Sequence, residues 1–228
     1  MQVTYLGHFC FLVEVNGLKL LFDPFISGNP LAKNIDIQKI KADFIILSHG
    51  HADHCADTLE IYKNNPNATL IAMYEITEWF ANQGVKNTHP MNIGGTFSFD
   101  FGSIKMVQAV HSSTLPDGKP GGSAAGFLIK TKEGDFYFAG DTALHYDMKL
   151  ISLWSDTLKF AMMPIGDNFT MGYEDACIAA DFVGVEKVIG AHYDSFGYIV
   201  ISHEEAKNHF KNNQKELLLL NLEETINL

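Results

Sequence analysis

The amino-acid sequence predicts an α/β protein arranged as a four-layer α/β/β/α sandwich, in which two mixed sheets face each other and helices lie outside. Short apolar runs of strand length occur in both halves of the chain, and segments with helical character are interspersed among them. No fixed-period repeat, linker or low-complexity tract interrupts the chain, so we expect residues 1–228 to form one domain. Composition alone does not separate this arrangement from other α/β folds.

In the N-terminal third, apolar runs predict five strands, which cover residues 3–6, 9–15, 18–22, 43–48 and 68–73. Asn16-Gly17, between the second and third runs, is a strong signal for a two-residue hairpin turn. The fourth strand, with the sequence DFIILS, is expected to be fully buried. Helices are predicted after each of the last two strands, over residues 54–65 and 75–84, and the first of them stops before Pro66.

The rest of the chain predicts two hairpins followed by alternating helices and strands: hairpins at 96–110 and 124–140, helices at 147–154, 173–184 and 204–213, and strands at 160–165, 187–191 and 217–222. Ser202 and Glu205 form a capping-box pattern at the start of the last helix. The glycine- and proline-rich loop 112–123, between the hairpins, has no hydrophobic period. It is interpreted either as a lid over a site or as a plain surface connection.

The charged residues narrow the class of partner. All sixteen basic residues are lysines and the formal net charge is −11. Because arginine supplies the rigid fork that reads phosphate and guanine, this chain is a poor candidate for broad nucleic-acid binding. The N-terminal residues show no signal-peptide pattern, and no apolar run approaches the ~20 residues that span a bilayer. We therefore expect a cytoplasmic protein with a small-molecule substrate and no membrane partner; the oligomeric state is not predicted.

The stretch SHGHADHCAD, residues 48–57, places three histidines and two aspartates directly after the predicted buried strand. His49 and His51 stand two apart, which fits an extended or turning backbone rather than one face of a helix. Asp53 and His54 are adjacent and point in different directions, so they do not easily serve the same ion as the first pair. The spacing therefore predicts two neighbouring ions fed by one loop, in preference to a solvated polar loop.

The pattern His49-x-His51-x-Asp53-His54 resembles the signature of the metallo-β-lactamase superfamily. The later motifs of that superfamily occur in the expected order: an aspartate after an early strand, a lone histidine after a middle strand, an aspartate in a Gly-Asp-Thr turn and a histidine after a late strand. These residues are Asp23, His111, Asp141 and His192. The resemblance spans practically the whole chain and implies the four-layer sandwich of the superfamily.

The resemblance also implies roles for these residues. His49, His51 and His111 would hold one ion, while Asp53, His54 and His192 would hold a second, with Asp141 bridging the two. Asp53, His54 and Asp141 would be the catalytic residues, and Asp23 would support the metal-binding loop from behind. Two divalent metal ions are implied; zinc is the default for such a nitrogen and oxygen donor set, which manganese, iron, cobalt or nickel would also suit.

Three further stretches, YLGHFCFLVEV, FDPFISGNP and MPIGDNFTMGYEDA, resemble a bacterial subgroup of the superfamily. Its members are mostly uncharacterised metal-dependent hydrolases and are similar to ascorbate-6-phosphate lactonases. By this resemblance His8 and Asn168 would approach the substrate, whereas the alternative for Asn168 is an ordinary turn residue. Cys55 is interpreted as a buried thiol rather than as a soft metal ligand, and His145 is expected to lie outside the site.

The chemistry that follows is hydrolysis. Two divalent ions ~3.5–4 Å apart can share a water and lower its pKa towards ~7, and the metal-bound hydroxide then attacks carbon or phosphorus. We expect a metal-dependent hydrolase of a small ester, lactone or phosphoester. The alternatives are a nuclease or phosphodiesterase of the same fold, and a non-catalytic metal-dependent binding or sensing module.

Overall fold

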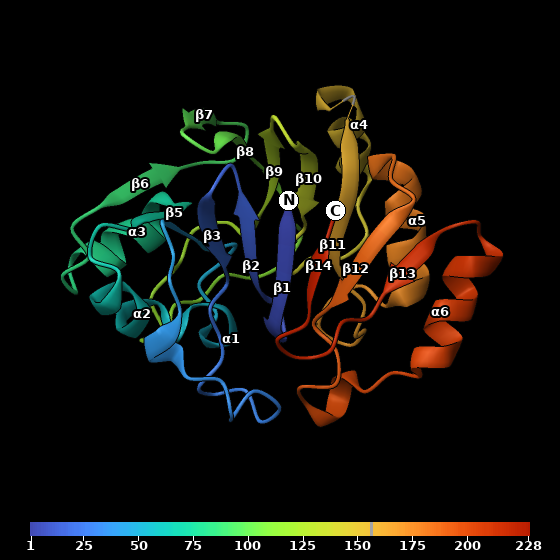
Figure 1. Ribbon diagram of the computed structural model, residues 1–228, viewed down its shortest axis with the longest axis horizontal. Helices are drawn as coiled ribbons and strands as arrows, with labels where there is room; N and C mark the ends of the chain where they lie inside the picture. Colours follow the sequence, from blue (N-terminus) through green and yellow to red (C-terminus); the bar gives the residue numbers. More distant parts are fainter. Residues whose placement is uncertain (156) are drawn as a thin grey trace.

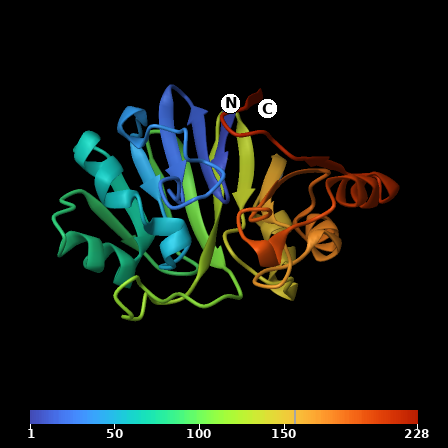
Figure 2. The ribbon, with the colours of Figure 1, turned by 90° about the horizontal axis from the view of Figure 1, so that it is seen from below.

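The computed structural model describes residues 1–155 and 157–228. Within them, two seven-stranded mixed sheets lie face to face and helices flank them on the outside (Figures 1 and 2). The strand order is β14-β1-β2-β3-β4-β5-β6 in the first sheet and β13-β12-β11-β10-β9-β8-β7 in the second. The predicted arrangement of two mixed sheets with helices outside is confirmed.

The first sheet joins the N-terminal third of the chain to its C-terminal end. Its strands are β1 (Gln2–Gly7), β2 (Cys10–Val15), β3 (Leu18–Phe22), β4 (Phe44–Ile46), β5 (Thr69–Met73), β6 (Thr88–Met91) and β14 (Thr225–Asn227). Asn16 and Gly17 have φ of 53° and 75°, as a two-residue turn with positive φ at both central positions requires. The predicted hairpin between β2 and β3 is confirmed. Strands β6 and β14 were not predicted.

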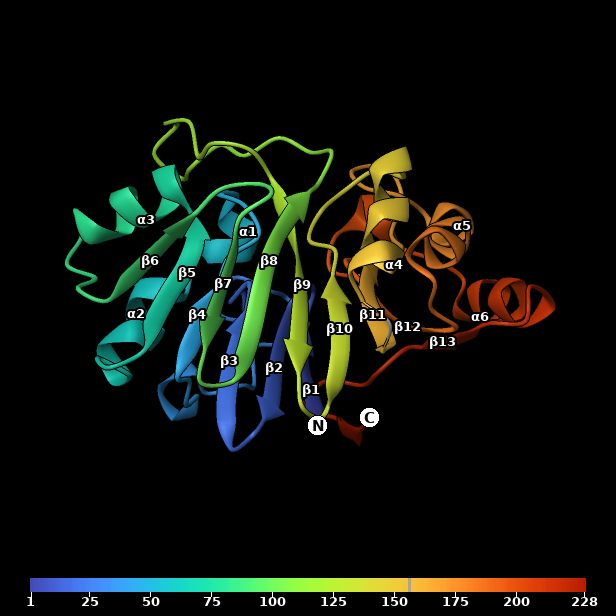
Figure 3. The same cartoon turned by 90° about the horizontal axis from the view of Figure 1, so that it is seen from above.

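The second sheet continues the chain from the middle onward. Its strands are β7 (Thr96–Phe99), β8 (Gly102–Gln108), β9 (Ala125–Thr131), β10 (Gly134–Phe138), β11 (Leu158–Pro164), β12 (Lys187–Ala191) and β13 (Glu216–Leu218). Strands β7 to β10 pair antiparallel, whereas β10 to β13 pair parallel. Each sheet therefore has an antiparallel part and a parallel part, and Figure 3 shows the antiparallel parts lying over each other.

The helices pack on the parallel part of each sheet. They are α1 (Ala52–Cys55), α2 (Thr58–Asn64), α3 (Tyr74–Ala81), α4 (Ile151–Trp154), α5 (Tyr173–Val183) and α6 (His203–Asn212), with short 3₁₀ turns η1 (Ile37–Lys39), η2 (Tyr146–Leu150) and η3 (Gly197–Ile199). Helix α3 packs on β5 and β6, α5 on β11 and α6 on β13. Ser202 caps α6 by accepting a hydrogen bond from the Glu205 amide at 3.3 Å. No helix of the described residues is long and apolar enough to cross a membrane.

Aromatic side chains fill the space between the two sheets. Phe138 on β10 packs against Phe9 and Phe22, with ring centroids 4.8 and 4.6 Å apart. All three rings are fully buried, and such aromatic pairs contribute about 0.5–1.5 kcal/mol each beyond the area they bury. Polar residues follow directly where several of these strands end: Asp23 after β3 and His192 after β12. The sheet packing therefore decides where these residues meet.

Candidate metal centre

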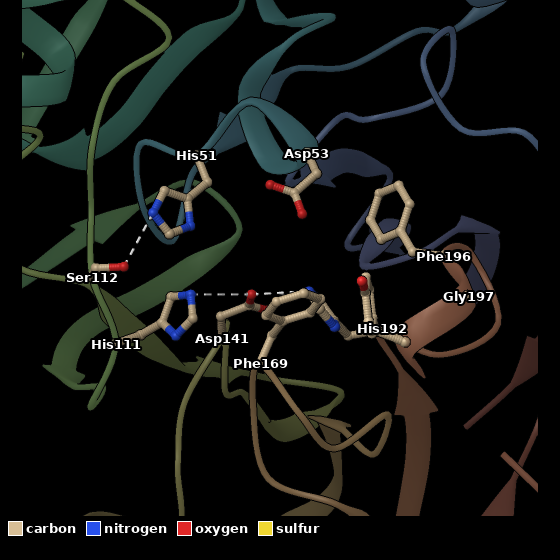
Figure 4. A pocket seen from close by; sticks show the side chains of 10 residues that line it. His51, Asp53, His111, Ser112, Asp141, Phe169, His192, Phe196 and Gly197 are labelled. Atoms are coloured by element: carbon tan, nitrogen blue, oxygen red, sulfur yellow. Dashed lines mark hydrogen bonds and ion pairs between the residues drawn. The ribbon is translucent and has the colours of Figure 1, made fainter. Parts of the chain in front are cut away.

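The residues predicted to bind metal lie together at one edge of the two sheets. They are His49, His51, Asp53, His54, His111, Asp141 and His192. The first four lie in the loop after β4 and on helix α1, and the other three follow β8, β10 and β12. Segments far apart in the sequence thus contribute side chains to one point, as Figure 4 shows for His51, His111, Asp141 and His192.

The first cluster consists of His49, His51 and His111, whose ligand nitrogens lie within 4.8 Å of one another. The Nε2 atom of His49 is 3.0 Å from Nδ1 of His51. The other ring nitrogen of His51 lies 3.2 Å from the hydroxyl of Ser112 (Figure 4). With the His51 proton held towards Ser112, the Nδ1 electron pair is directed at the same place as His49 Nε2. This is the arrangement that a tetrahedral ion site requires.

The second cluster consists of Asp53, His54 and His192, together with His8. The ligand atoms of these four residues again lie within 4.8 Å of one another. His8, His54 and His192 are almost fully buried, whereas the carboxylate of Asp53 is 30% exposed and faces the cavity described below. The structure therefore brings His8 beside the residues that were predicted to hold the second ion.

Asp141 lies between the two clusters. Its Oδ2 atom is 3.0 Å from His192 Nε2, 3.3 Å from His54 Nε2 and 3.5 Å from His111 Nε2. Gly140 makes this position possible, because it has φ of 60° and a Cβ there would lie 2.7 Å from the Cβ of Ser48. The carboxylate of Asp141 is thus within reach of an ion at either cluster.

Asp23 fixes the orientation of the histidines from behind. Its Oδ2 accepts hydrogen bonds from His54 Nδ1 at 2.8 Å and from the Ser48 hydroxyl at 2.5 Å, and its Oδ1 accepts from the Ser48 amide. Because the Ser48 hydroxyl donates to Asp23, the Nδ1 of His49, 2.9 Å from that hydroxyl, must donate to it. In both imidazoles Nε2 therefore points to the side of Asp141 while Nδ1 is held from behind, as in metal-binding histidines.

Burial and charge set the protonation of the two clusters. Burial lowers the pKa of His49, His51 and His111, so these imidazoles are neutral at pH 7. Burial alone would raise the pKa of Asp141, but His192 and His54 hold it well below its ordinary value. Burial likewise opposes a proton on His54, yet Asp141 and Asp23 raise its pKa well above 6.5. The centre is therefore an anionic carboxylate surrounded by imidazoles, which attracts a cation.

Unpaired buried atoms show that the residues fit a metal ion. Among the described residues, His54 Nε2 and Asp141 Oδ1 have no hydrogen-bond partner although both are buried. A buried polar atom without a partner costs about 1–3 kcal/mol, so such atoms call for an explanation. Imidazole nitrogens and carboxylate oxygens are the donors that zinc and related divalent ions prefer. A divalent ion bound beside Asp141 would satisfy both atoms.

A cavity of about 580 Å³ opens above the clusters. It is lined by His51, Asp53, His111, Ser112, Asp141, Phe169, His192, Phe196, Gly197 and Tyr198. Figure 4 shows His51, Ser112 and His111 on the left, Phe196 and His192 on the right, and Asp53, Asp141 and Phe169 between them. Ser112 is the residue of the loop 112–123 that reaches the cavity; Leu115 is buried against Gly50, whose amide donates to Ser113 at 3.1 Å. This loop supports the His49–His51 segment.

Three residues singled out in the sequence do not line this cavity. Asn168, which was predicted to approach the substrate, lines a neighbouring cavity with Asp167 and Glu174. His145 lines a third cavity beside Trp154. His8, the other predicted substrate contact, is fully buried beneath the clusters and does not line the cavity of the candidate site.

Comparison with known proteins agrees with this geometry. A family model described as a beta-lactamase superfamily domain matches residues 19–193. The chain belongs to the metallo-β-lactamase superfamily. Relatives named "UPF0173 metal-dependent hydrolase" are 50% identical over 228 residues in Flavobacterium johnsoniae and 46% identical over 229 residues in Christiangramia forsetii, with 100% of both chains covered in each case. The chain is thus a metal-dependent hydrolase.

Solved structures of other proteins share the fold. Igni18, described as a metallo hydrolase of Ignicoccus hospitalis, gives a TM-score of 0.88 at 31% identity, covering 99% of this chain and 97% of its own. An isothiocyanate hydrolase from Delia radicum gut bacteria gives 0.78 at 17% identity, covering 100% and 99%. The first similarity supports the family, and the second shows the fold alone.

In this superfamily member, two residues that follow the histidine motif support the centre without joining it. Asp57 is 3% exposed, and its carboxylate accepts hydrogen bonds from the amides of Ile26 and Ser27 at 2.6 and 2.8 Å. Cys55 donates to the Gly50 carbonyl, and burial raises the pKa of its thiol to about 12. That Asp57 accepts these hydrogen bonds was not predicted from the sequence. Its place two residues after Cys55 was the available signal.

Proposed function

We propose that this metal-dependent hydrolase holds two divalent ions, one at each cluster, and hydrolyses a small, uncharged ester, lactone or phosphoester that carries an apolar group. One observation carries the proposal: two ligand clusters share Asp141 at the floor of a cavity whose wall is aromatic. Zinc is the first candidate for both ions, and manganese, iron, cobalt and nickel suit the same donors.

The residues of the chain have distinct tasks in this reaction. Divalent ions supply Lewis acidity, which lowers the pKa of water and stabilises negative charge that develops on the substrate. Burial alone would raise the pKa of Asp53, but the neighbouring imidazoles of His8 and His54 lower it, so its carboxylate is ionised and can orient the attacking water. The new bond joins the water oxygen to carbon or phosphorus, the bond to the leaving oxygen breaks, and that oxygen takes up a proton.

The cavity indicates the class of substrate. Its volume lies within the range of small-molecule sites, and its lining contains no lysine. Phe169, Phe196 and Tyr198 offer apolar surface next to the clusters, which favours an aryl or alkyl group. The formal net charge of −11 also repels anions at low ionic strength. These features favour a neutral substrate with an apolar part over a sugar phosphate or a polymer.

Elemental analysis of protein purified without added metal would identify the ions and their number. The metal found is then used in a screen with p-nitrophenyl butyrate, a γ-lactone and bis(p-nitrophenyl) phosphate. His51→Ala and Asp141→Ala should abolish turnover while circular dichroism shows an intact fold. His209→Ala, on helix α6 and outside the centre, should behave as the wild type.

Three results would overturn this proposal. Full activity in folded His51→Ala or Asp141→Ala protein would remove the centre from the reaction. Activity on RNA and on bis(p-nitrophenyl) phosphate alone would indicate a nuclease or phosphodiesterase. Metal binding without turnover of any compound in a broad panel would indicate a binding or sensing module.

A further inference from the structure

His8 is held in an unusual backbone conformation at the junction between β1 and β2. It has φ of 55°, and Gly7 before it has φ of 103°. The register of the β1–β2 pair shifts between Tyr5 and Gly7, which marks a β-bulge. Bulges commonly redirect a side chain beside a functional site. A residue other than glycine keeps the left-handed backbone conformation only where the surrounding structure holds it. His8 also precedes residues 19–193, which the family model matches.

One ring nitrogen of His8 has a partner in the protein. Nδ1 lies 3.1 Å from the hydroxyl of Ser195, and that hydroxyl lies 3.3 Å from the carbonyl oxygen of Tyr193, which can only accept. When Ser195 donates to this carbonyl, its oxygen accepts the proton of His8 Nδ1. The imidazole then carries its proton on Nδ1 and an electron pair on Nε2.

The other ring nitrogen faces the second cluster and has no partner. His8 is 0% exposed, and its Nε2 makes no hydrogen bond within the described residues. The nearest carboxylate oxygen, Asp53 Oδ2, lies 3.4 Å away, and both atoms then present electron pairs to each other. Two electron-pair donors that face each other at this distance are stable when a cation lies between them. The His8 ring also lies 4.1 Å from that of His192, measured between centroids.

We propose that His8 is a further protein ligand of the second ion, through Nε2, beside Asp53, His54 and His192. This inference rests on the proposed two-ion centre. With Asp141 shared, the second site has five protein donors, whereas the first site has His49, His51, His111 and Asp141. A site with more protein donors has fewer open positions, so the second ion is held more tightly and the first ion is the one more open to substrate.

The test measures metal binding directly. Metal-free wild-type protein is titrated with Zn²⁺ or Co²⁺ against a competing chelator, alongside His8→Asn, His8→Gln and the control His209→Gln. Asparagine tolerates positive φ, which favours folding of the His8→Asn variant, and circular dichroism checks each protein. Wild type and His209→Gln should bind two ions. Both His8 variants should weaken the tighter site by more than ~100-fold, beyond the ~10–100-fold typical of a lost supporting residue.

A second readout separates a ligand from a hydrogen-bond partner of Asp53. In Co²⁺-loaded protein, the ring N–H proton of each metal-bound histidine gives a strongly shifted, exchangeable proton NMR signal, and the signal of His8 should vanish in His8→Gln. A glutamine amide can donate to Asp53, so wild-type affinity in His8→Gln with all shifted signals retained would overturn the inference. A wild type that binds two ions independently of His8 refutes this inference alone. If the wild type binds no ion, both this inference and the two-ion centre are refuted. If the wild type binds one ion and both His8 variants bind none, His8 is supported as a ligand and the two-ion centre is refuted.

Discussion

The backbone amide of His192 donates a hydrogen bond to the carbonyl oxygen of His8 at 2.9 Å, and both residues have φ of 55°. The left-handed conformation costs a residue with a side chain about 1–2 kcal/mol. Because His192 follows the second sheet and His8 lies in the first, this bond joins the sheets at the second cluster. The strain is held by the packing of the whole fold, which fixes the two imidazoles before any ion binds.

Asp23→Asn should weaken metal binding by roughly 10–100-fold, the effect typical of a lost partner of a ligating histidine. An asparagine amide has no negative charge and only one acceptor oxygen, so it cannot replace the carboxylate that accepts hydrogen bonds from both His54 and Ser48. The imidazole of His54 therefore loses its fixed orientation. Chelator competition measures the change. The exposed Asp100 supplies the control, and equal affinities for Asp23→Asn and Asp100→Asn would contradict the expectation.

Phe169→Ala and Tyr198→Ala should each raise KM about tenfold for substrates with an aryl or long alkyl group, and leave kcat largely unchanged. Both rings line the cavity while remaining 50% and 78% exposed, so they contact the bound group without shaping the core. Loss of ~1.4 kcal/mol of apolar contact corresponds to that factor. Steady-state kinetics with a butyrate and an acetate ester test this, since the acetate should respond less. Tyr146→Ala, with an exposed ring outside the cavity, is the control.

Gly166→Ala should lower the free energy of unfolding by about 1–3 kcal/mol, the range for overpacked sites. A Cβ at this position would lie 2.0 Å from the carbonyl oxygen of His192, a backbone atom of a buried residue. Urea unfolding measures the loss, and metal affinity should fall with it because His192 is displaced. Gly197→Ala, where a Cβ meets no atom within 4 Å, should be near neutral in stability.

Alkaline pH should destabilise metal-free protein in part through Cys55. Burial raises the pKa of this thiol from its ordinary value of 9.0 to about 12. Between those values the folded protein holds a proton that the unfolded chain has lost, so the free energy of unfolding falls as pH rises from 9 to 12. The contribution is about 1 kcal/mol by pH 10, and Cys55→Ser should lack it. Identical pH profiles of wild type and Cys55→Ser in urea titrations would refute the assignment.

Much of the fold follows from local sequence, and what was missed has identifiable reasons. The buried strands β4 and β5 are apolar runs, and the turn residues Asn16 and Gly17 have one natural conformation. Strand β6 contains Pro90, and β14 has one apolar residue, so neither shows a strand pattern. Both lie at the ends of the first sheet, where pairing with a neighbour defines a strand more than composition does.

The part of the site that could be predicted is the part encoded in the spacing of histidines and aspartates along the sequence. His49 and His51 lie in one group of possible ligands and Asp53 and His54 in another, while His49 and His54 also lie together with Asp23. His8 has no such signature, because it is a single histidine whose place depends on a bulge and on contact between the sheets. Asn168 was expected near the substrate, but it and Asp167 both have positive φ, and Asn168 lines the neighbouring cavity.

The aromatic packing of Phe22 against Phe138 has a consequence far from its own place in the core. Asp23 follows Phe22 directly, and Asp141 comes three residues after Phe138, so the contact between these two rings helps to set the distance between Asp23, which orients His54, and Asp141, which lies between the clusters. Ions differ in radius by tenths of an ångström. The spacing of the candidate metal ligands can therefore be adjusted from inside the core, by exchanging one ring for a slightly larger or smaller side chain while every ligand residue keeps its identity.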